Sequence, residues 1–216
     1  MRRSAKAASL TRERLVTVAL ELIDEHGGEE LSMRALAARV NRQVSSLYNH
    51  VTSRDDLIEA LRARVVAGID TSAFAEREWD AALESWARSY LTAFAAHPNL
   101  IRLLSNTPIR DASTFDMYER VVAALLDAGW PVSDAVAVMR AVEAHVLGSA
   151  LDIVAPADLL DQASVPPGHP AMHTALDPAL DGAFGADRAF ELGLAALMTG
   201  LRARHTATID AQPAHR

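Results

Sequence analysis

A short stretch of the chain, residues 42–50, is rich in hydrogen-bonding side chains and contains no acidic residue. Val44 and Leu47 are spaced to share one buried helix face, which leaves the other positions facing solvent. Those positions are Arg42, Gln43, Ser45, Ser46, Tyr48, Asn49 and His50. Amide and guanidinium groups pair with base edges, and hydroxyl and imidazole groups suit phosphate oxygens. Because an acid would repel phosphate, this composition favours contact with duplex DNA. A small solvated helical face is the alternative.

Helices on either side must position this stretch. One helix is expected after Thr11, ending at 26–28, and a short one after Ser32, ending at the break 41–43. A third begins near Val44, and a fourth follows Ser53. Thr and Ser are good N-cap residues because their hydroxyls accept a hydrogen bond from the first turn. Two short helices that lean on a longer one form a helix-turn-helix, whose last helix can enter the major groove.

Helical periodicity continues to the end of the chain, and no run of strand-like alternation interrupts it. A long loop is expected at 156–185, where Pro, Asp, Gly and His accumulate. The fold class is therefore predicted to be all-α, with a tri-helical helix-turn-helix domain followed by a larger helical domain. Helices beyond residue 70 are expected at about 79–97, 100–104, 113–128, 133–154 and 186–204.

The charge is divided unevenly along the chain. Residues 1–66 contain eleven Arg or Lys and nine Asp or Glu, whereas the other 150 residues contain ten and nineteen. Only the first third therefore suits a phosphate backbone, although a solubilising acidic body explains the same asymmetry. The chain has no cysteine, which excludes disulfides and thiolate chemistry. Without an apolar span or a signal peptide, a cytoplasmic protein is expected.

We divide the chain into three parts. Residues 1–10 form a flexible basic arm, in which Arg2, Arg3 and Lys6 either touch phosphate or stay solvated. The DNA-binding domain covers 11–66, and 67–216 forms a domain for effector binding and dimerisation.

Three motifs follow one another in the first third of the chain: Leu-Ser-Met-Arg-Ala-Leu-Ala-Ala-Arg-Val at 31–40, Leu-Tyr-Asn-His-Val at 47–51 and Arg-Asp-Asp-Leu-Ile at 54–58. Together they resemble the DNA-binding domain of TetR-family repressors. The resemblance implies base or groove contact by Gln43, Val44, Ser45, Ser46 and Tyr48. It implies phosphate contact by Ser32, Arg34, His50 and Arg54. The turn departs from the family pattern of Gly then Val, because Asn41 and Arg42 stand there. Asn tolerates the left-handed conformation that this turn needs, whereas Arg42 must point outward or shift the packing.

The larger domain is similar to the ligand-binding domain of the tetracycline-repressor branch. This similarity rests on four short stretches: His-Pro at 97–98, Asn-Thr-Pro at 106–108, the turn at 126–130 and His-Val-Leu-Gly at 145–148. It implies a mostly apolar effector pocket between helices. A metal-chelated tetracycline is disfavoured because the stretch 102–105 has no histidine. The candidate lining residues, each of which could instead be ordinary core, are Trp86, Tyr90, Phe94, His97, Asn106, Phe115, Tyr118, Met139, Glu143 and His145.

A homodimer is expected through the helix at 133–154, the eighth, and the last helix. The resemblance implies that they form a four-helix bundle with a second copy. Small residues that permit close approach are Ala135, Val138, Val142, Val146, Ser149, Gly193, Ala196 and Gly200. Arg140 and Glu143 are candidates for an ion pair at this interface. A two-fold dimer predicts a pseudo-palindromic operator.

Two other function classes must be weighed. His169 and His173, near Asp161, Asp177 or Asp181, could form the metal site of an enzyme, but they lie in the Pro-containing loop. The chain has no glycine-rich phosphate loop and no nucleophile elbow. A constitutive architectural protein would not need so large a second domain. We therefore expect a non-enzymatic regulator without cofactor or metal, a repressor that a small-molecule effector releases from DNA.

Overall fold

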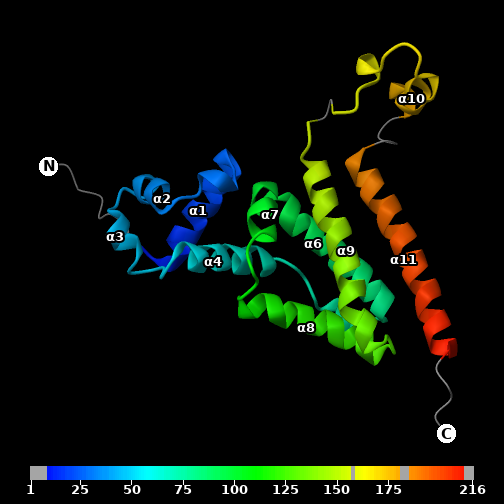
Figure 1. Ribbon diagram of the computed structural model, residues 1–216, viewed down its shortest axis with the longest axis horizontal. Coiled ribbons are helices and arrows are strands. Elements are labelled where there is room, and N and C mark those ends of the chain that lie inside the picture. Colours follow the sequence, from blue (N-terminus) through cyan, green and yellow to red (C-terminus); the bar gives the residue numbers. More distant parts are fainter. Residues whose placement is uncertain (1–8, 157–158, 181–184, 212–216) are drawn as a thin grey trace, which may run out of the picture. The chain divides into compact units, whose positions relative to one another are not determined.

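The computed structural model describes residues 9–156, 159–180 and 185–211 (Figure 1). In these residues the chain forms helices joined by turns and loops, with no strand, so the all-α prediction is confirmed. Within the same residues no helix is both long and apolar enough to cross a bilayer. The basic arm predicted at 1–10 lies almost entirely outside the described residues, and Arg2, Arg3 and Lys6 are among those left out.

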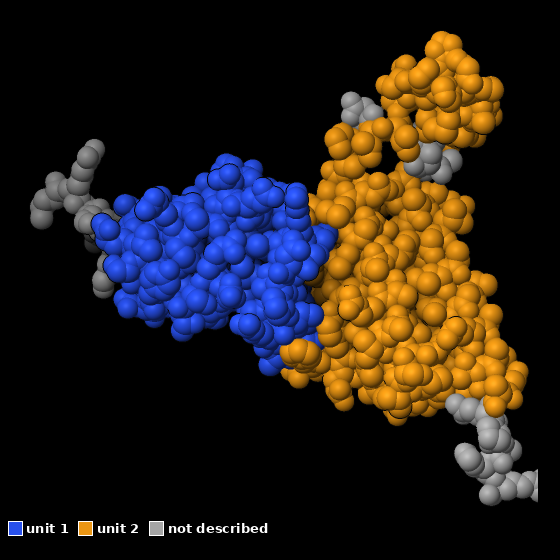
Figure 2. Space-filling view, in the orientation of Figure 1, with its two compact units in different colours: residues 1–67, 99–114 blue, residues 68–98, 115–216 orange. Residues whose placement is uncertain are grey.

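The chain divides into two compact units (Figure 2). The first unit consists of residues 1–67 and 99–114, and the second of 68–98 and 115–216. The first unit thus takes in a segment from the middle of the chain that lies beyond the domain boundary drawn at residue 66. That boundary stays a prediction about function, because a compact unit need not be a functional domain.

Four helices build most of the first unit: α1 (Arg12–His26), α2 (Met33–Arg39), α3 (Val44–Leu47) and α4 (Arg54–Val66). α1 packs against α2 and α4, and α2 packs against α3. Their fully buried side chains include Leu15, Ile23, Leu36, Leu47 and Leu57. Removing such aliphatic side chains from water is the main stabilising contribution to a small helical unit.

The predicted N-caps of this unit are confirmed. The hydroxyl of Thr11 accepts a hydrogen bond from the backbone N–H of Arg14 (3.1 Å), which starts α1. Ser32 and Ser53 do the same for α2 and α4, at 3.1 and 3.0 Å. Each cap satisfies a backbone donor that the first turn of a helix leaves unpaired.

α7 (Pro98–Ser105) belongs mainly to the first unit. The side-chain amide of Asn99 donates to the carbonyl oxygens of Ile23 (3.2 Å) and Asp24 (3.1 Å) at the end of α1. Leu100, Ile101 and Leu104 are buried, as the apolar spacing of this short piece predicted. α8 (Ala112–Asp127) starts in the first unit and continues in the second.

The second unit is built on α6 (Trp79–Ala95), α9 (Val132–Ile153) and α11 (Ala186–Ala211). α9 packs against both α6 and α11 (Figure 1), and α5 (Ala73–Glu76) packs against α6. Large apolar side chains such as Trp86, Leu83 and Leu194 are fully buried between these helices.

Three features of the second unit differ from the sequence-based expectation. α5 is a single turn, too short for a hydrophobic period to reveal. The expected long loop contains a short helix, α10 (Pro170–Ala175), flanked by the 3₁₀ turns η2 (Gln162–Ser164) and η3 (Pro178–Leu180). Pro170 stands at the first position of α10, where proline favours a helix instead of breaking it. α11 continues to Ala211, about two turns past the predicted end at residue 204.

The prediction of which α9 residues face a second copy is wrong for four positions. Ala135, Val138, Val142 and Val146 are at most 5% exposed and belong to the core of their own unit. Gly193 also faces inward, because a Cβ at this position would lie 2.4 Å from Cε1 of His145. α9 is apolar on more than one side. The periodicity of its sequence therefore does not show which side packs in the core of its own unit and which side faces a second copy.

Candidate functional site

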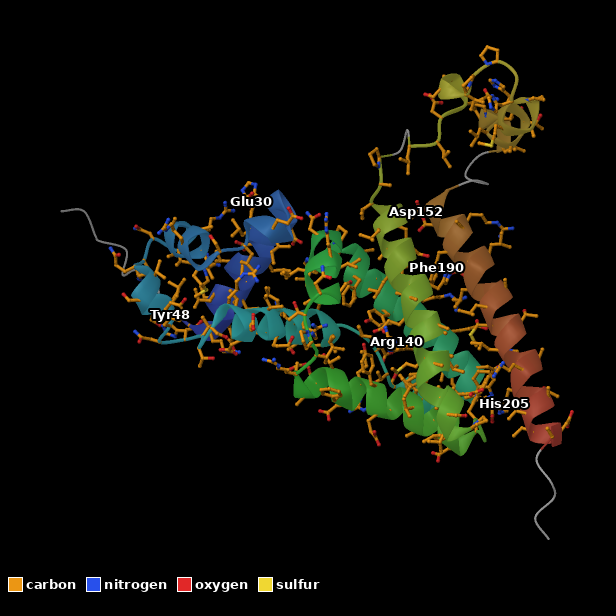
Figure 3. All side chains as sticks on the ribbon, viewed as in Figure 1. Glu30, Tyr48, Arg140, Asp152, Phe190 and His205 are labelled. Carbon is orange, nitrogen blue, oxygen red and sulfur yellow. The ribbon has the colours of Figure 1, made fainter. Side chains whose placement is uncertain are left out.

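The DNA-reading segment predicted at 42–50 is a short, solvent-facing element. Gln43 caps α3, which covers only Val44–Leu47, and the chain then turns through His50. Leu47 is fully buried and fixes the segment to the unit. Tyr48 follows at the C-cap and is 49% exposed, at the edge of the unit in Figure 3. The helix is thus shorter than predicted, and most but not all of the side chains expected to face outward are exposed.

Most of the predicted DNA contacts are exposed: Ser32, Arg34, Arg42, Gln43, Ser45, Tyr48, Asn49 and Arg54. Val44, Ser46 and His50 are half-buried. The side chains of Gln43, Ser45, Tyr48 and Asn49 have no hydrogen-bond partner among the described residues. Their donors and acceptors are therefore available to another molecule.

The unusual turn before this segment is formed as expected. Asn41 adopts a left-handed conformation with φ of 51°, the only such non-glycine residue in the described chain. The N–H of Arg42 then donates to the carbonyl oxygen of Ala37 at 2.9 Å, and the Arg42 side chain is exposed. Of the two possibilities for Arg42, the structure shows the outward one.

An ion pair that the sequence analysis did not anticipate ties this segment down. The guanidinium of Arg12 donates to both carboxylate oxygens of Asp56, at 2.9 and 2.6 Å, and to the carbonyl oxygen of His50 at 3.2 Å. Asp56 also accepts from the N–H and the hydroxyl of Thr52, at 2.7 and 3.1 Å. The hydrogen bonds from Arg12 hold the pKa of Asp56 well below its usual range. This Arg12–Asp56 clamp joins the starts of α1 and α4 to the end of the reading segment.

Two residues predicted to contact phosphate, Arg54 and Ser32, make hydrogen bonds within the protein that still leave donors available for a phosphate. Arg54 donates through Nε to the carbonyl oxygen of Leu31 at 3.2 Å, which holds the exposed side chain while its terminal nitrogens stay available. Ser32 accepts the N-cap hydrogen bond of α2 and keeps its own hydroxyl hydrogen for a phosphate oxygen.

A second ion pair, which is more buried than the first, connects α4 to the end of α7 and the segment that follows it. Arg62 is buried and donates to the carbonyl oxygens of Leu104 (3.4 Å) and Thr107 (2.9 Å) and to Glu59 (3.1 Å). Glu59 in turn accepts from the backbone N–H groups of Arg110 (2.6 Å) and of Asp111 (2.8 Å). We call these two side chains the Arg62–Glu59 latch.

The first unit also has a cleft of about 940 Å³ lined by residues of α1, α4 and the stretch 110–112. Arg12, Asp56 and Glu59, which belong to the clamp and the latch, line it together with other charged side chains. Pockets for drug-sized molecules are mostly apolar, so this charged cleft is a poor match for such a ligand.

Five of the ten candidate effector contacts come together in the second unit. Trp86, Tyr90 and Phe94 form an aromatic ladder along α6, with ring centroids 5.2 and 4.9 Å apart. The hydroxyl of Tyr90 donates to Oε1 of Glu143 on α9 at 2.8 Å, and the hydroxyl of Tyr118 on α8 donates to the same oxygen. Burial, followed by the negative charge of Glu143, raises the pKa of Tyr90 above its usual range, so this phenol stays neutral.

The other five candidates lie elsewhere. Met139 is buried one turn before Glu143, whereas His145 stacks on the ring of Phe190 (labelled in Figure 3) and lies 3.0 Å from its carbonyl oxygen. Phe115 is 54% exposed, and His97 is half-buried just after α6. Asn106 is exposed and belongs to the first unit.

The proposed ion pair between Arg140 and Glu143 is not formed within the described chain. Glu143 is engaged by the two tyrosines, and Arg140 is exposed on α9 (Figure 3).

The histidine pair of the 156–185 region is part of a local turn structure. His169 is the N-cap of α10, with Nδ1 3.2 Å from the carbonyl oxygen of Pro166, and His173 lies within the helix. Asp161 and Asp177 accept from backbone N–H groups two residues on, and Asp181 is outside the described residues. Where the chain is described, no three His, Asp or Glu side chains are grouped so that they could hold a metal ion.

Comparison with known protein families shows which family the chain belongs to. The family model for bacterial regulatory proteins of the tetR family matches residues 15–61, and the model for the tetracyclin repressor-like C-terminal domain matches residues 73–205. The chain belongs to the TetR family. Members of the TetR family are transcriptional regulators, so this protein is a DNA-binding transcriptional regulator.

Individual TetR-family relatives agree with this assignment. An HTH-type transcriptional regulator of Saccharopolyspora erythraea is 30% identical over 90% of this chain and 85% of its own length. The HTH-type transcriptional repressor DrrR1 of Streptomyces coeruleorubidus is 31% identical over 66% of this chain, and the matched part is 53% of DrrR1. The chain thus matches about half of that repressor. The structure of ActR from Streptomyces coelicolor in complex with actinorhodin has a TM-score of 0.72 and 27% identity, covering 92% of this chain and 99% of ActR.

Proposed function

We propose that this protein is a homodimeric repressor that binds a pseudo-palindromic operator and is released from it by a small-molecule effector. The observation that carries the proposal is the acid-free segment 42–50, in which Leu47 is anchored in the core and four exposed polar side chains, those of Gln43, Ser45, Tyr48 and Asn49, make no hydrogen bond within the described chain. Such a helix end can lie in a major groove without repelling phosphate. A DNA-binding regulator of this kind works in the cytoplasm, and no enzymatic activity is proposed.

In and around this segment we assign two kinds of contact. Gln43 and Tyr48, with Ser45, Ser46 and the half-buried Val44, would face base edges. Arg34, Ser32, His50 and Arg54 would bind phosphate and set the position of the helix, with Arg42 and Asn49 adding contacts at either end of the segment. Base contacts give sequence specificity, whereas phosphate contacts give affinity that salt weakens.

We place the dimer interface on α9 and α11, as the sequence suggested, but on a different face of α9. Three large apolar side chains on these helices are exposed to water: Val136 (51% exposed) and Leu151 (48%) on α9, and Leu192 (62%) on α11. Small exposed residues at helical spacing lie between them: Ala137, Ala141, Ala144 and Gly148 on α9, and Ala196 and Ala203 on α11. Two such helices from each copy can approach closely in a four-helix bundle.

Effector binding is proposed for the second unit, around the aromatic ladder and Glu143. ActR, which shares the fold, has been crystallised with actinorhodin, and this supports a ligand-responsive role for its relatives. α7 follows α6 directly in the chain, and the Arg62–Glu59 latch ties the end of α7 to α4. A shift of α6 would therefore reach α4 through covalent connection and this latch. The coupling between two such sites is typically about 1–3 kcal/mol.

The latch offers a test of this route. Arg62→Met keeps an apolar stem but removes the hydrogen bonds to Leu104, Thr107 and Glu59. The variant should still bind operator, but the effector concentration that releases half of the DNA should rise about tenfold, as expected for a loss of about 1.4 kcal/mol of coupling. The effector for this assay is the compound with the largest thermal shift in a metabolite and drug panel. An unchanged release curve would show that the signal does not pass through Arg62.

The proposed function itself is tested by selecting duplexes from a random pool with the wild-type protein. We expect one sequence with two related half-sites about one helical turn apart, retained in a gel-shift assay. The double variant Gln43→Ala/Tyr48→Ala should lose this retention yet stay dimeric. A control, Glu21→Ala, changes an exposed α1 residue and should behave as wild type. Enrichment of no sequence, or retention by the double variant, would contradict the proposal.

A further inference from the structure

The polar groups around the aromatic ladder are incompletely satisfied, and what they lack describes a ligand. Both tyrosine hydroxyls donate to Oε1 of Glu143, so Oε2 has no hydrogen bond among the described residues. Glu143 also makes no ion pair there, although it is half-buried. A carboxylate partly removed from water and held only by neutral phenols has lost hydration without gaining a counter-charge.

Buried aromatic side chains stand beside this carboxylate. Tyr90 connects the two features, because its hydroxyl binds Glu143 while its ring lies 5.2 Å from Trp86 and 4.9 Å from Phe94. The faces of such rings attract cations, and their surface binds apolar or aromatic bodies. A carboxylate beside an aromatic ladder is thus suited to a cation carried on an apolar body.

An unpaired donor nearby is an independent observation. Trp86 is fully buried, and its indole Nε1–H has no hydrogen-bond partner in the described chain. A buried N–H without an acceptor is costly and rare, and a ligand oxygen is one group that would satisfy it.

We infer that the effector is a protonated amine on an apolar or aromatic body, which binds the carboxylate of Glu143 and lies along Trp86, Tyr90 and Phe94. An oxygen acceptor on that body would meet the Trp86 N–H. This inference rests on the proposed function only in taking the second unit as the effector-binding part. A neutral effector would leave Glu143 without a counter-charge, and an anion would be repelled by it.

The test compares amines with neutral molecules of the same shape on the full-length protein at pH 7. Tryptamine, 4-phenylbutylamine and 2-(1-naphthyl)ethylamine are titrated by calorimetry, each beside the alcohol that has a hydroxyl in place of the amino group. We expect at least one amine to bind tenfold or more tightly than its alcohol. Equal or tighter binding of the alcohols, or no binding of any amine at millimolar concentration, would overturn the inference.

Variants show whether Glu143 is the group responsible. Glu143→Gln keeps the size of the side chain and an oxygen that the tyrosines can bind, so the preference for amine over alcohol should fall below threefold. Tyr118→Phe keeps the carboxylate and should keep the preference. Glu119→Gln removes an exposed carboxylate of α8 and is the matched control. A preference that survives in Glu143→Gln, or disappears in Glu119→Gln, would overturn the assignment.

These results are separable from the test of the proposed function. Calorimetry needs no DNA, and operator retention needs no amine. A protein that binds its selected operator and is released by a neutral compound would remain a repressor, with the amine inference overturned. A protein that binds amines through Glu143 but selects no operator would contradict the proposed function and leave the inference standing.

Discussion

The unpaired side chains of Gln43, Tyr48 and Asn49 stand beside a buried Leu47. Sequence alone indicated these outward positions, because residue type and the absence of acid are visible without coordinates. The clamp that holds them was not visible, because Arg12 and Asp56 are 44 residues apart and each looks like an ordinary solvated charge. A pairing of this kind depends on how α1 and α4 cross.

At the residue scale, we predict that Asp56→Asn lowers the free energy of unfolding at pH 7 by about 1 kcal/mol, since the Arg12–Asp56 pair is partly solvent-exposed. The pKa of Asp56 is lowered in the folded state, so its stabilisation is present in full above the ordinary carboxyl pKa of about 4 and decreases as the pH falls below that value. The difference in melting temperature between wild type and variant should be constant from pH 7 to 5 and narrow below about pH 4.

The neighbouring substitution Asp55→Asn is the control, because Asp55 is exposed and no hydrogen bond or ion pair of its side chain is found in the described chain. If Asp56→Asn has the same stability as wild type at pH 7, or if the difference widens in acid, the clamp does not stabilise the fold in the way described.

At the element scale, short-range signals predicted helix starts well. The caps at Thr11, Ser32 and Ser53 depend on one side chain and its own first turn, so they are readable from sequence. The single-turn α5 and the six-residue α10 were missed, because each is shorter than the window in which a helical period can be recognised.

The turn between α2 and α3 gives a second prediction. Asn41 has φ of 51°, a conformation that costs about 1–2 kcal/mol for a residue with an ordinary Cβ and nothing for glycine. Asn41→Ala should therefore lower the free energy of unfolding by about 1 kcal/mol, and Asn41→Gly by much less. Urea unfolding of both variants measures this. Equal destabilisation by Ala and Gly would mean that the conformation of the turn is not what Asn41 supplies.

At the scale of the whole molecule, the sequence predicted that α9 and the last helix form the dimer, but it could not show which face of α9 is left exposed. Val138 and Val142 look as suitable for an interface as Val136 does, but the first two are buried by their own unit and Val136 is half exposed. Only the packing of α9 against α6 and α11 separates the two faces. Only some of the candidate effector residues come together for the same reason, since Asn106 and His145 have suitable chemistry but lie among other neighbours.

The interface is tested by placing a charge on its exposed side. Ala196→Arg adds a long charged group to α11, which should shift the protein from dimer to monomer in light scattering, because burying an unpaired charge between copies is costly. Ala81→Arg, at an exposed position of α6, should stay dimeric. A dimeric Ala196→Arg with wild-type affinity would move the interface away from this face.

The central claim is that the segment 42–50 reads base edges, and the affinity of Gln43→Ala for two duplexes tests it most directly. Fluorescence anisotropy at one fixed salt concentration would compare the selected operator with a scrambled duplex of the same composition. Loss of a base contact should weaken operator binding by about 1–3 kcal/mol, roughly 5- to 150-fold, and leave binding to the scrambled duplex unchanged. An equal loss on both duplexes, or no loss on either, would contradict the claim.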